Sequence, residues 1–254
     1  MRGIDMLYVT VTFWLYVVVL SAWGVHALWS GMIKPRAVNI VLLPGTLVAQ
    51  LGHVLGLLVT GATVTNTTLY KDDESGEPQT TQDAKPRVPV LGPIVIGMLP
   101  LLACGLAVFL LAHYMGGGFV VGLTEQHVAN PLPTTLAGFW DLLHHQITMV
   151  EAVVNATLQS DLRSWQVWIF LYLLVCLTVR MAPFPGHIRG ALGAILMLGV
   201  LLGLIGMISG RAVNAVQNSW PVLSLTVATL TFLLLISLLI RGVVGLVRIL
   251  ATSR

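Results

Sequence analysis

The chain has little charge and almost no cysteine. Only 9% of its 254 residues are charged while 56% are hydrophobic, more apolar surface than a water-soluble domain of this length could bury. Its two cysteines, Cys104 and Cys176, both lie in apolar runs, which excludes a disulfide framework or a Cys-x-x-Cys metal knuckle and favours small packing residues. The net charge of +3 is spread over segment ends, so no nucleic-acid partner is indicated. The composition predicts a multispanning membrane protein whose surroundings are the lipid bilayer.

Several signatures of other functions are also missing from the sequence. It contains no P-loop, no dinucleotide-binding glycine pattern and no nucleophile elbow. It also has no run of carboxylates within its apolar segments, which an ion-coupled pump would need. A transporter or channel subunit therefore stays only as a secondary alternative.

The apolar segments predict an all-α polytopic fold. A helix needs about 20 apolar residues to cross the hydrocarbon core, and about six segments approach or exceed that length. The predicted helices run over Leu7 to Trp29, Ala37 to Val59, Val90 to Tyr114, Trp165 to Val179, Ile188 to Ile208, and Val222 to Ile240. The first begins close to Met1 without a cleavage pattern, which predicts a retained signal-anchor.

Basic residues in the connecting segments predict the orientation. With six crossings, nine of the 13 Lys and Arg residues fall on the side that also holds both termini. Cytoplasmic segments are enriched in Lys and Arg, so we expect cytoplasmic N- and C-termini. The polar stretch 60–89 then forms a small cytoplasmic hairpin, and the stretch 115–164 is exoplasmic and carries an interfacial amphipathic helix.

A short stretch of the second predicted helix resembles a degenerate metal motif. The letters V-A-Q-L-G-H, from Val48 to His53, have the spacing of His-Glu-x-x-His, with Ala49 and Gln50 in place of the first His and the Glu. Such a pair binds zinc because positions i and i+4 share one helix face. Alanine has no ligand atom, and glutamine cannot act as a general base.

The surrounding order resembles the site-2 protease superfamily of intramembrane zinc metallopeptidases. After the motif come the polar hairpin, a helix that opens with "VPVLGPIVIGMLP", and much later "VRMAPFPGHIRGAL". By resemblance, His53 matches the second zinc His, and Gly92 and Pro93 match the family's Gly-Pro element. Arg180 and Pro183 fall near the family's Asn and Pro, and His187 falls near its ligand Asp.

The differences from the family pattern lie at the residues that zinc-dependent hydrolysis requires. The first His, the general base and the ligand Asp are all replaced, so the resemblance predicts a pseudo-metallopeptidase and no cofactor. The alternative is an intramembrane metallopeptidase with a non-standard zinc site on His53 and His187, although a catalytic zinc normally has three protein ligands. A purely structural interpretation is that Gln50 and His53 form hydrogen bonds between helices.

The sequence divides into three regions. Residues 1–36 form the signal-anchor and its connection, 37–210 form the site-2-protease-like core, and 211–254 form the final helix and a basic tail that suits an anionic cytoplasmic leaflet. Small residues four apart predict close helix packing, notably at Gly199, Gly203, Gly206 and Gly210. The expected role is a binding, scaffolding or regulatory subunit that contacts another membrane protein or a second copy of itself.

Overall fold

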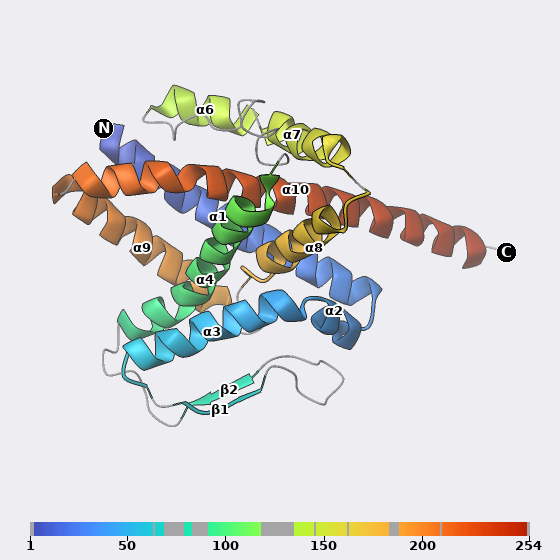
Figure 1. Cartoon of the computed structure of the whole chain (residues 1–254), viewed down its shortest axis with the longest axis horizontal. Coiled ribbons are helices and arrows are strands. Elements are labelled where there is room, and N and C mark those ends of the chain that lie inside the picture. The colour runs from blue at the N-terminus through green and yellow to red at the C-terminus, as the bar shows by residue number, and fades with distance from the viewer. Residues whose placement is uncertain are drawn as a thin grey trace.

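The computed structural model is built mainly of helices. It describes residues 3–62, 64–68, 79–82, 91–117, 135–144, 146–161, 163–182, 188–208 and 210–252. The helices are α1 (Gly3–Met32), α2 (Pro35–Val41), α3 (Leu43–Val59), α4 (Leu91–Met115), α6 (Leu136–His144), α7 (Gln146–Gln159), α8 (Trp165–Val179), α9 (Ile188–Ile208) and α10 (Gly210–Thr252), with two strands, β1 (Val64–Thr68) and β2 (Gln79–Gln82) (Figure 1).

Three of these helices are long and apolar enough to cross a membrane. Among the described residues the candidate spans are Leu7–Met32, Gly92–Met115 and Leu223–Leu246, which match the first, third and sixth predicted helices. Helix α8 has 15 residues, fewer than the roughly 20 that a perpendicular crossing needs, and the apolar stretch identified within α9, Ile195–Leu204, is also shorter than that. The helices are consistent with a membrane protein, while the number of crossings stays a prediction.

The second predicted helix is broken rather than continuous. Helices α2 and α3 meet at Leu42 with a bend of 79°, which makes them a broken span or a re-entrant segment. Pro44 stands in the first turn of α3 and has no backbone N–H, so the hydrogen bond to the carbonyl of Ile40 cannot form. Hydropathy alone does not register this interruption, because the residues on both sides of Leu42 are apolar.

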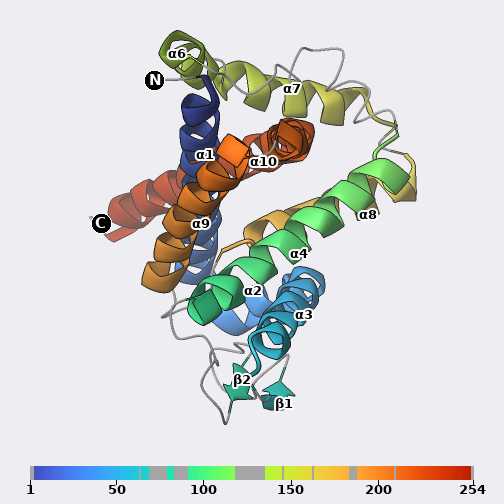
Figure 2. The same ribbon diagram turned by 90° about the vertical axis from the view of Figure 1, so that its left-hand side faces the viewer.

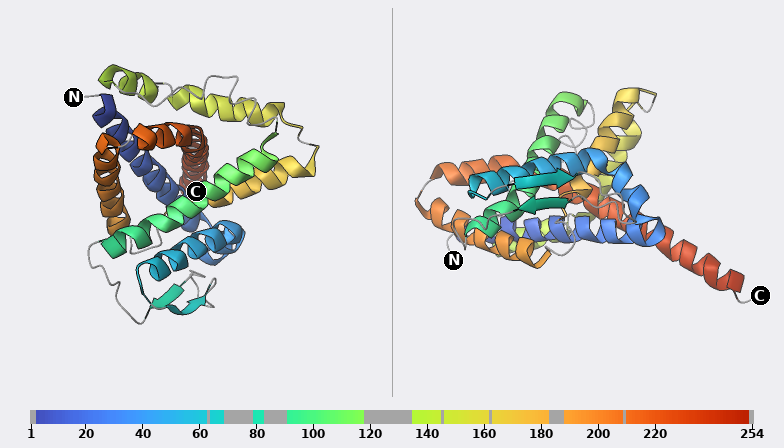
Figure 3. Two further views of the ribbon diagram at one scale, coloured as in Figure 1. Left: turned by 60° about the vertical axis from the view of Figure 1, so that its left-hand side comes forward. Right: turned by 90° about the horizontal axis from the view of Figure 1, so that it is seen from below.

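Helices α1 and α10 form the longest packed pair, and they run in the same direction. Trp14 packs near Trp220, with ring centroids 6.1 Å apart, and further along both helices Trp29 Nε1 donates to Ser237 Oγ at 2.8 Å. Both tryptophans of the first pair are buried. Figure 3 shows α10 continuing beyond the end of α1 toward the C-terminus. The residues 210–221, which precede the start predicted for the sixth helix at Val222, belong to this helix.

The stretches outside the predicted helices contain short elements. Strands β1 and β2 pair antiparallel, from Val64 opposite Gln82 to Thr68 opposite Gln79, and the residues between them lie outside the described part. Within the predicted exoplasmic segment, α6 and α7 run along one edge of the molecule beyond α10 (Figure 2).

Candidate functional site

The degenerate motif lies on α3, and its two replaced positions are buried. Ala49 is 1% exposed and Gln50 is 3% exposed, whereas His53 is partly exposed. Residues four apart on a helix share a face, so Ala49 and His53 point in the same general direction. The position that would carry the first zinc ligand is therefore filled by an apolar methyl group inside the core.

Glycines on α3 bring its backbone against α4. A Cβ added to Gly52 would lie 2.6 Å from the carbonyl oxygen of Leu99 and 2.8 Å from Pro100 Cα, and one added to Gly56 would lie 2.9 Å from Ile96 Cα. Gly52 thus faces residues 99–100, and Gly56 faces residue 96. Residue numbers rise along α3 while those of its neighbours on α4 fall, so the two helices are antiparallel. Gly-x-x-x-Gly spacing permits such close approach. Sequence analysis quoted this stretch for its histidine and overlooked these two glycines.

The opposite face of α3 presents leucine side chains to the surroundings. Its exposed positions recur at helical spacing and are the kind of surface that a hydrocarbon environment covers. They are Leu47, Leu51, Leu55 and Leu58. Helix α3 therefore has a small, buried face toward α4 and an apolar outer face.

A buried polar junction lies beside the break between α2 and α3. Arg180, which follows α8, donates from Nη2 to Asn39 Oδ1 on α2 at 2.5 Å, and both residues are 5% exposed. His26 on α1 also contacts this amide oxygen, with Nε2 3.3 Å from it. Because a cation within apolar surroundings requires polar partners, this junction ties together α1, α2 and the end of α8.

Helix α8 also supplies donors to the backbone at the break. Tyr172 donates its hydroxyl to the carbonyl oxygen of Val41 at 2.7 Å, and Cys176 Sγ lies 3.4 Å from the same oxygen. Across from them, a Cβ on Gly45 would overlap the carbonyl of Cys176. Irregular backbone at membrane depth needs such partners, because no water is available there. The break is therefore held in place by α8.

The structure describes only some of the residues that were predicted to bind a metal or to pack helices together. His187 and Pro183 lie outside the described residues, so the proposed pair with His53 has no measured separation. At the predicted Gly-Pro element, Gly92 is buried and Pro93 is exposed in the first turn of α4. Within the described part, no three His, Cys, Asp or Glu side chains gather as a metal site. Whether zinc binds stays an open prediction.

The predicted small-residue stripe of α9 is not uniform. A Cβ on Gly199 would collide with Thr12 on α1, whereas no described residue outside α9 comes within 4 Å of one on Gly203. The surroundings of Gly206 and Gly210 fall outside the described part of the chain. Gly199 is thus a point of close approach between α1 and α9, and the same helix pair is joined by Tyr16, which donates to the carbonyl of Leu192 at 2.8 Å.

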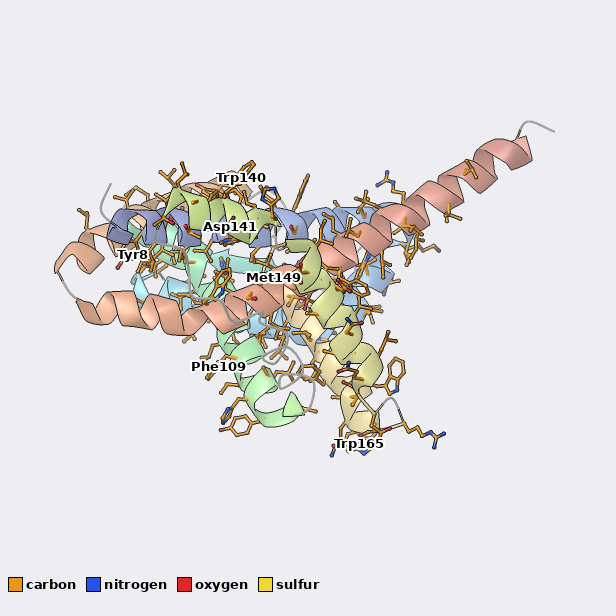
Figure 4. All side chains as sticks on the ribbon, turned by 90° about the horizontal axis from the view of Figure 1, so that it is seen from above. Tyr8, Phe109, Trp140, Asp141, Met149 and Trp165 are labelled. Carbon is orange, nitrogen blue, oxygen red and sulfur yellow. The ribbon has the colours of Figure 1, made fainter. Side chains whose placement is uncertain are left out.

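The side chains labelled in Figure 4 show which aromatic residues lie near the surface and which belong to the core. Trp140 and Trp165 are exposed, and Phe109 on α4 is also exposed. Met149 on α7 is buried and meets Ser224 on α10, with 3.9 Å between Met149 Sδ and Ser224 Oγ. Within α6, His144 contacts the carbonyl oxygen of Trp140 through Nδ1 at 2.9 Å. The contact between Met149 and Ser224 docks α7 onto α10.

Comparison with known proteins adds no identification. No family model matches the chain, and no curated protein or solved structure matches it either.

The junction predicts a measurable coupling between Asn39 and Arg180. We expect Asn39→Leu and Arg180→Met each to destabilise the protein, and the double variant to lose less than the sum, with a coupling of about 1–2 kcal/mol. Unfolding free energies in mixed micelles, followed by circular dichroism, measure this cycle. Asn155→Leu on α7 with Arg163→Met after it supplies a control cycle whose terms should add. Additive losses at Asn39 and Arg180 would contradict the coupling.

Proposed function

We propose that this chain is an integral membrane protein whose site-2-protease-like core does not hydrolyse peptides and acts as a binding, scaffolding or regulatory subunit. The observation that carries the proposal is the burial of Ala49 within the apolar core, at the position where the resemblance places the first zinc ligand. A catalytic zinc requires three protein ligands and a water, and a methyl group can supply neither a ligand nor space for one.

The neighbouring residues support the same proposal. Gln50 is buried beside Ala49 and, as an amide, cannot take a proton from water as a glutamate would. Gly52 and Gly56 fix the rotation of α3 against α4, because their close contacts are with backbone atoms. Ala49 and Gln50 are therefore held in the interior, and their replacement suits packing better than catalysis.

The proposed binding role rests on the apolar outer surface. The leucine face of α3 and the exposed apolar side chains of α10, among them Leu235, Leu239 and Val243, offer surfaces to a bilayer or to another transmembrane helix. The occupant proposed here is a transmembrane segment of a partner protein or of a second copy. Such a segment would bind without being cut.

We further propose five crossings, with α2 and α3 as a re-entrant segment. Two parallel spans, α1 and α10, enter the membrane from the same side, so an odd number of crossings must separate the two termini. The 79° bend between α2 and α3 makes this pair the best candidate for a segment that returns to its side of entry. The even count expected from hydropathy does not fit the parallel pair.

The charge distribution agrees better with this arrangement than with six crossings. Cytoplasmic segments are enriched in Lys and Arg, and the five-crossing order puts ten of the 13 basic residues on the side of the C-terminus, against nine in the six-crossing order. Those ten are Lys34, Arg36, Lys71, Lys85, Arg87, Arg180, Arg189, Arg241, Arg248 and Arg254. The proposed C-terminus is cytoplasmic and the proposed N-terminus is exoplasmic.

Purification in mild detergent tests the proposed role through two readouts. We expect a stoichiometric partner chain, or a stable homo-oligomer by light scattering, together with substoichiometric zinc by inductively coupled plasma mass spectrometry. Matched single variants, His53→Ala and His187→Ala, should leave the zinc content unchanged, with His113→Ala as a control at an exposed residue of α4. Stoichiometric zinc that disappears in both of the first two variants would favour the metallopeptidase alternative, and a monomer without a partner would contradict the subunit role.

A further inference from the structure

The parallel packing of α1 and α10 gathers basic residues from distant parts of the sequence at one end of the helix pair. Arg241 lies over the last turn of α1, because a Cβ on Gly31 would be 3.6 Å from its Nη1 atom. Lys34 and Arg36 follow within five residues of Gly31, and the side chains of Lys34, Arg36 and Arg241 are all exposed. We call these three residues the basic edge.

The surroundings of Arg241 place the basic edge at the boundary of the hydrocarbon core. Its neighbours on α10 are apolar and exposed, including Leu239, Ile240 and Val243. Just inside this level, Trp29 donates to Ser237, and tryptophan is enriched where a helix meets the headgroup region. A long cationic side chain among exposed apolar residues extends its charge toward headgroups while its stem stays in the apolar layer.

The length of α10 supports the same boundary. Its 43 residues span roughly 65 Å at about 1.5 Å per residue, more than twice the hydrocarbon thickness of about 30 Å. A helix of this length that crosses a membrane must leave the hydrocarbon core. Arg241 lies beside Gly31, next to the end of the candidate span of α1 at Met32, and within the last two turns of the candidate span of α10, Leu223–Leu246. Figure 1 shows the last part of α10 extending past α1 and away from the other helices.

We propose that the basic edge binds the phosphate-containing headgroups of anionic phospholipids in the cytoplasmic leaflet. The basic edge combines three exposed cations from two helix ends and their connection. Basic residues at a membrane surface attract anionic lipids, and this charge complementarity identifies the occupant. The proposal rests on the proposed five-crossing arrangement, which puts the basic edge on the cytoplasmic side, and does not depend on the proposed subunit role.

Spin-labelled lipids test the proposal in reconstituted vesicles of the full chain. Electron spin resonance gives the association constant of spin-labelled phosphatidylglycerol relative to spin-labelled phosphatidylcholine in the lipid shell of the protein. We expect the wild-type protein to prefer phosphatidylglycerol. The variant Lys34→Gln/Arg36→Gln/Arg241→Gln should reduce the preference at the bound sites by up to about fivefold for each charge removed.

Matched variants separate charge recognition from a folding defect. Lys34→Arg/Arg36→Lys/Arg241→Lys keeps the three charges and should retain the preference, and Arg163→Gln removes an exposed charge elsewhere and should also retain it. Sodium chloride at 0.5 M should weaken the wild-type preference, whereas inorganic phosphate at matched ionic strength should compete no better than chloride. An equal preference in the wild-type and triple-Gln proteins would overturn the proposal, and so would selective displacement by inorganic phosphate, which would identify a free-phosphate site.

Discussion

Replacing Gly52 with alanine is expected to destabilise the protein by about 2 kcal/mol or more, because the new methyl group has no space between α3 and α4. Its Cβ would lie 2.6 Å from the carbonyl oxygen of Leu99 and 2.9 Å from Ala103 Cβ. The first of these atoms belongs to the backbone of α4, so a side-chain rotation cannot relieve the overlap. The two helices must move apart, and the packing around Ala49 and Gln50 must loosen with them.

Gly105→Ala is the matched control on α4. Apart from the adjacent backbone of α4 itself, no atom of the described residues lies within 4 Å of a Cβ at Gly105, so the added methyl group meets open space there. Alanine is more favourable than glycine inside a helix by roughly 0.5–1 kcal/mol, so this variant should be neutral or slightly more stable. Unfolding free energies of both variants in the same mixed micelles provide the comparison. Equal stability of the Gly52 and Gly105 variants would show that α3 and α4 do not pack through Gly52.

The helices that sequence analysis locates best are those defined by long apolar runs. The first, third and sixth predicted spans agree with α1, α4 and part of α10 within a few residues at most ends, because burial in lipid depends on segment length and hydropathy. The break at Leu42 escapes such reasoning, since the apolar character continues across it. Pro44 in the printed sequence is the local signal that could have indicated it.

The candidate site was predictable only where its residues are close in sequence. The spacing of Ala49, Gln50 and His53 follows from helix geometry, but which of them is buried depends on α4 and α8. The hydrogen bond between Asn39 and Arg180 joins residues 141 positions apart, and no local pattern reports such a contact. A polar residue inside the apolar run around Asn39 was the one available indication that a partner exists.

Hydropathy cannot show the direction of α10 relative to α1, and this direction has the largest consequence for the expected membrane topology. Apolar runs give the number of candidate crossings, whereas packing gives their directions. Trp14 with Trp220 and Trp29 with Ser237 follow the same order along both helices, so the pair is parallel. If both helices cross a membrane, as proposed, their parallel direction puts the N-terminus and the C-terminus on opposite sides of it.

Single cysteines and a membrane-impermeant maleimide applied to sealed cells test this arrangement as an all-or-none outcome. The native cysteines, Cys104 and Cys176, are buried at 0% and 1% exposure, so the wild-type chain is a suitable background. We expect Gly3→Cys and Gly118→Cys to be labelled from outside the cell. We expect Ser75→Cys and Ser253→Cys to react only after permeabilisation. The proposed re-entrant segment would return the chain to the cytoplasmic side before α4, and the proposed arrangement has α10 end on that side.

The labelling pattern distinguishes the proposed arrangement from its two competitors. Protection of Gly3→Cys together with Ser75→Cys and Ser253→Cys would support six crossings and contradict the parallel spans. Labelling of Ser75→Cys and Ser253→Cys from outside, with Gly3→Cys and Gly118→Cys protected, would invert the orientation and oppose the charge argument. The position of Ser75 distinguishes the two possibilities for α2 and α3. With an exoplasmic N-terminus, a full crossing by this pair after α1 would expose Ser75 outside the cell. A re-entrant segment would keep Ser75 inside, because Pro44 and the contacts of Val41 with α8 turn the chain back.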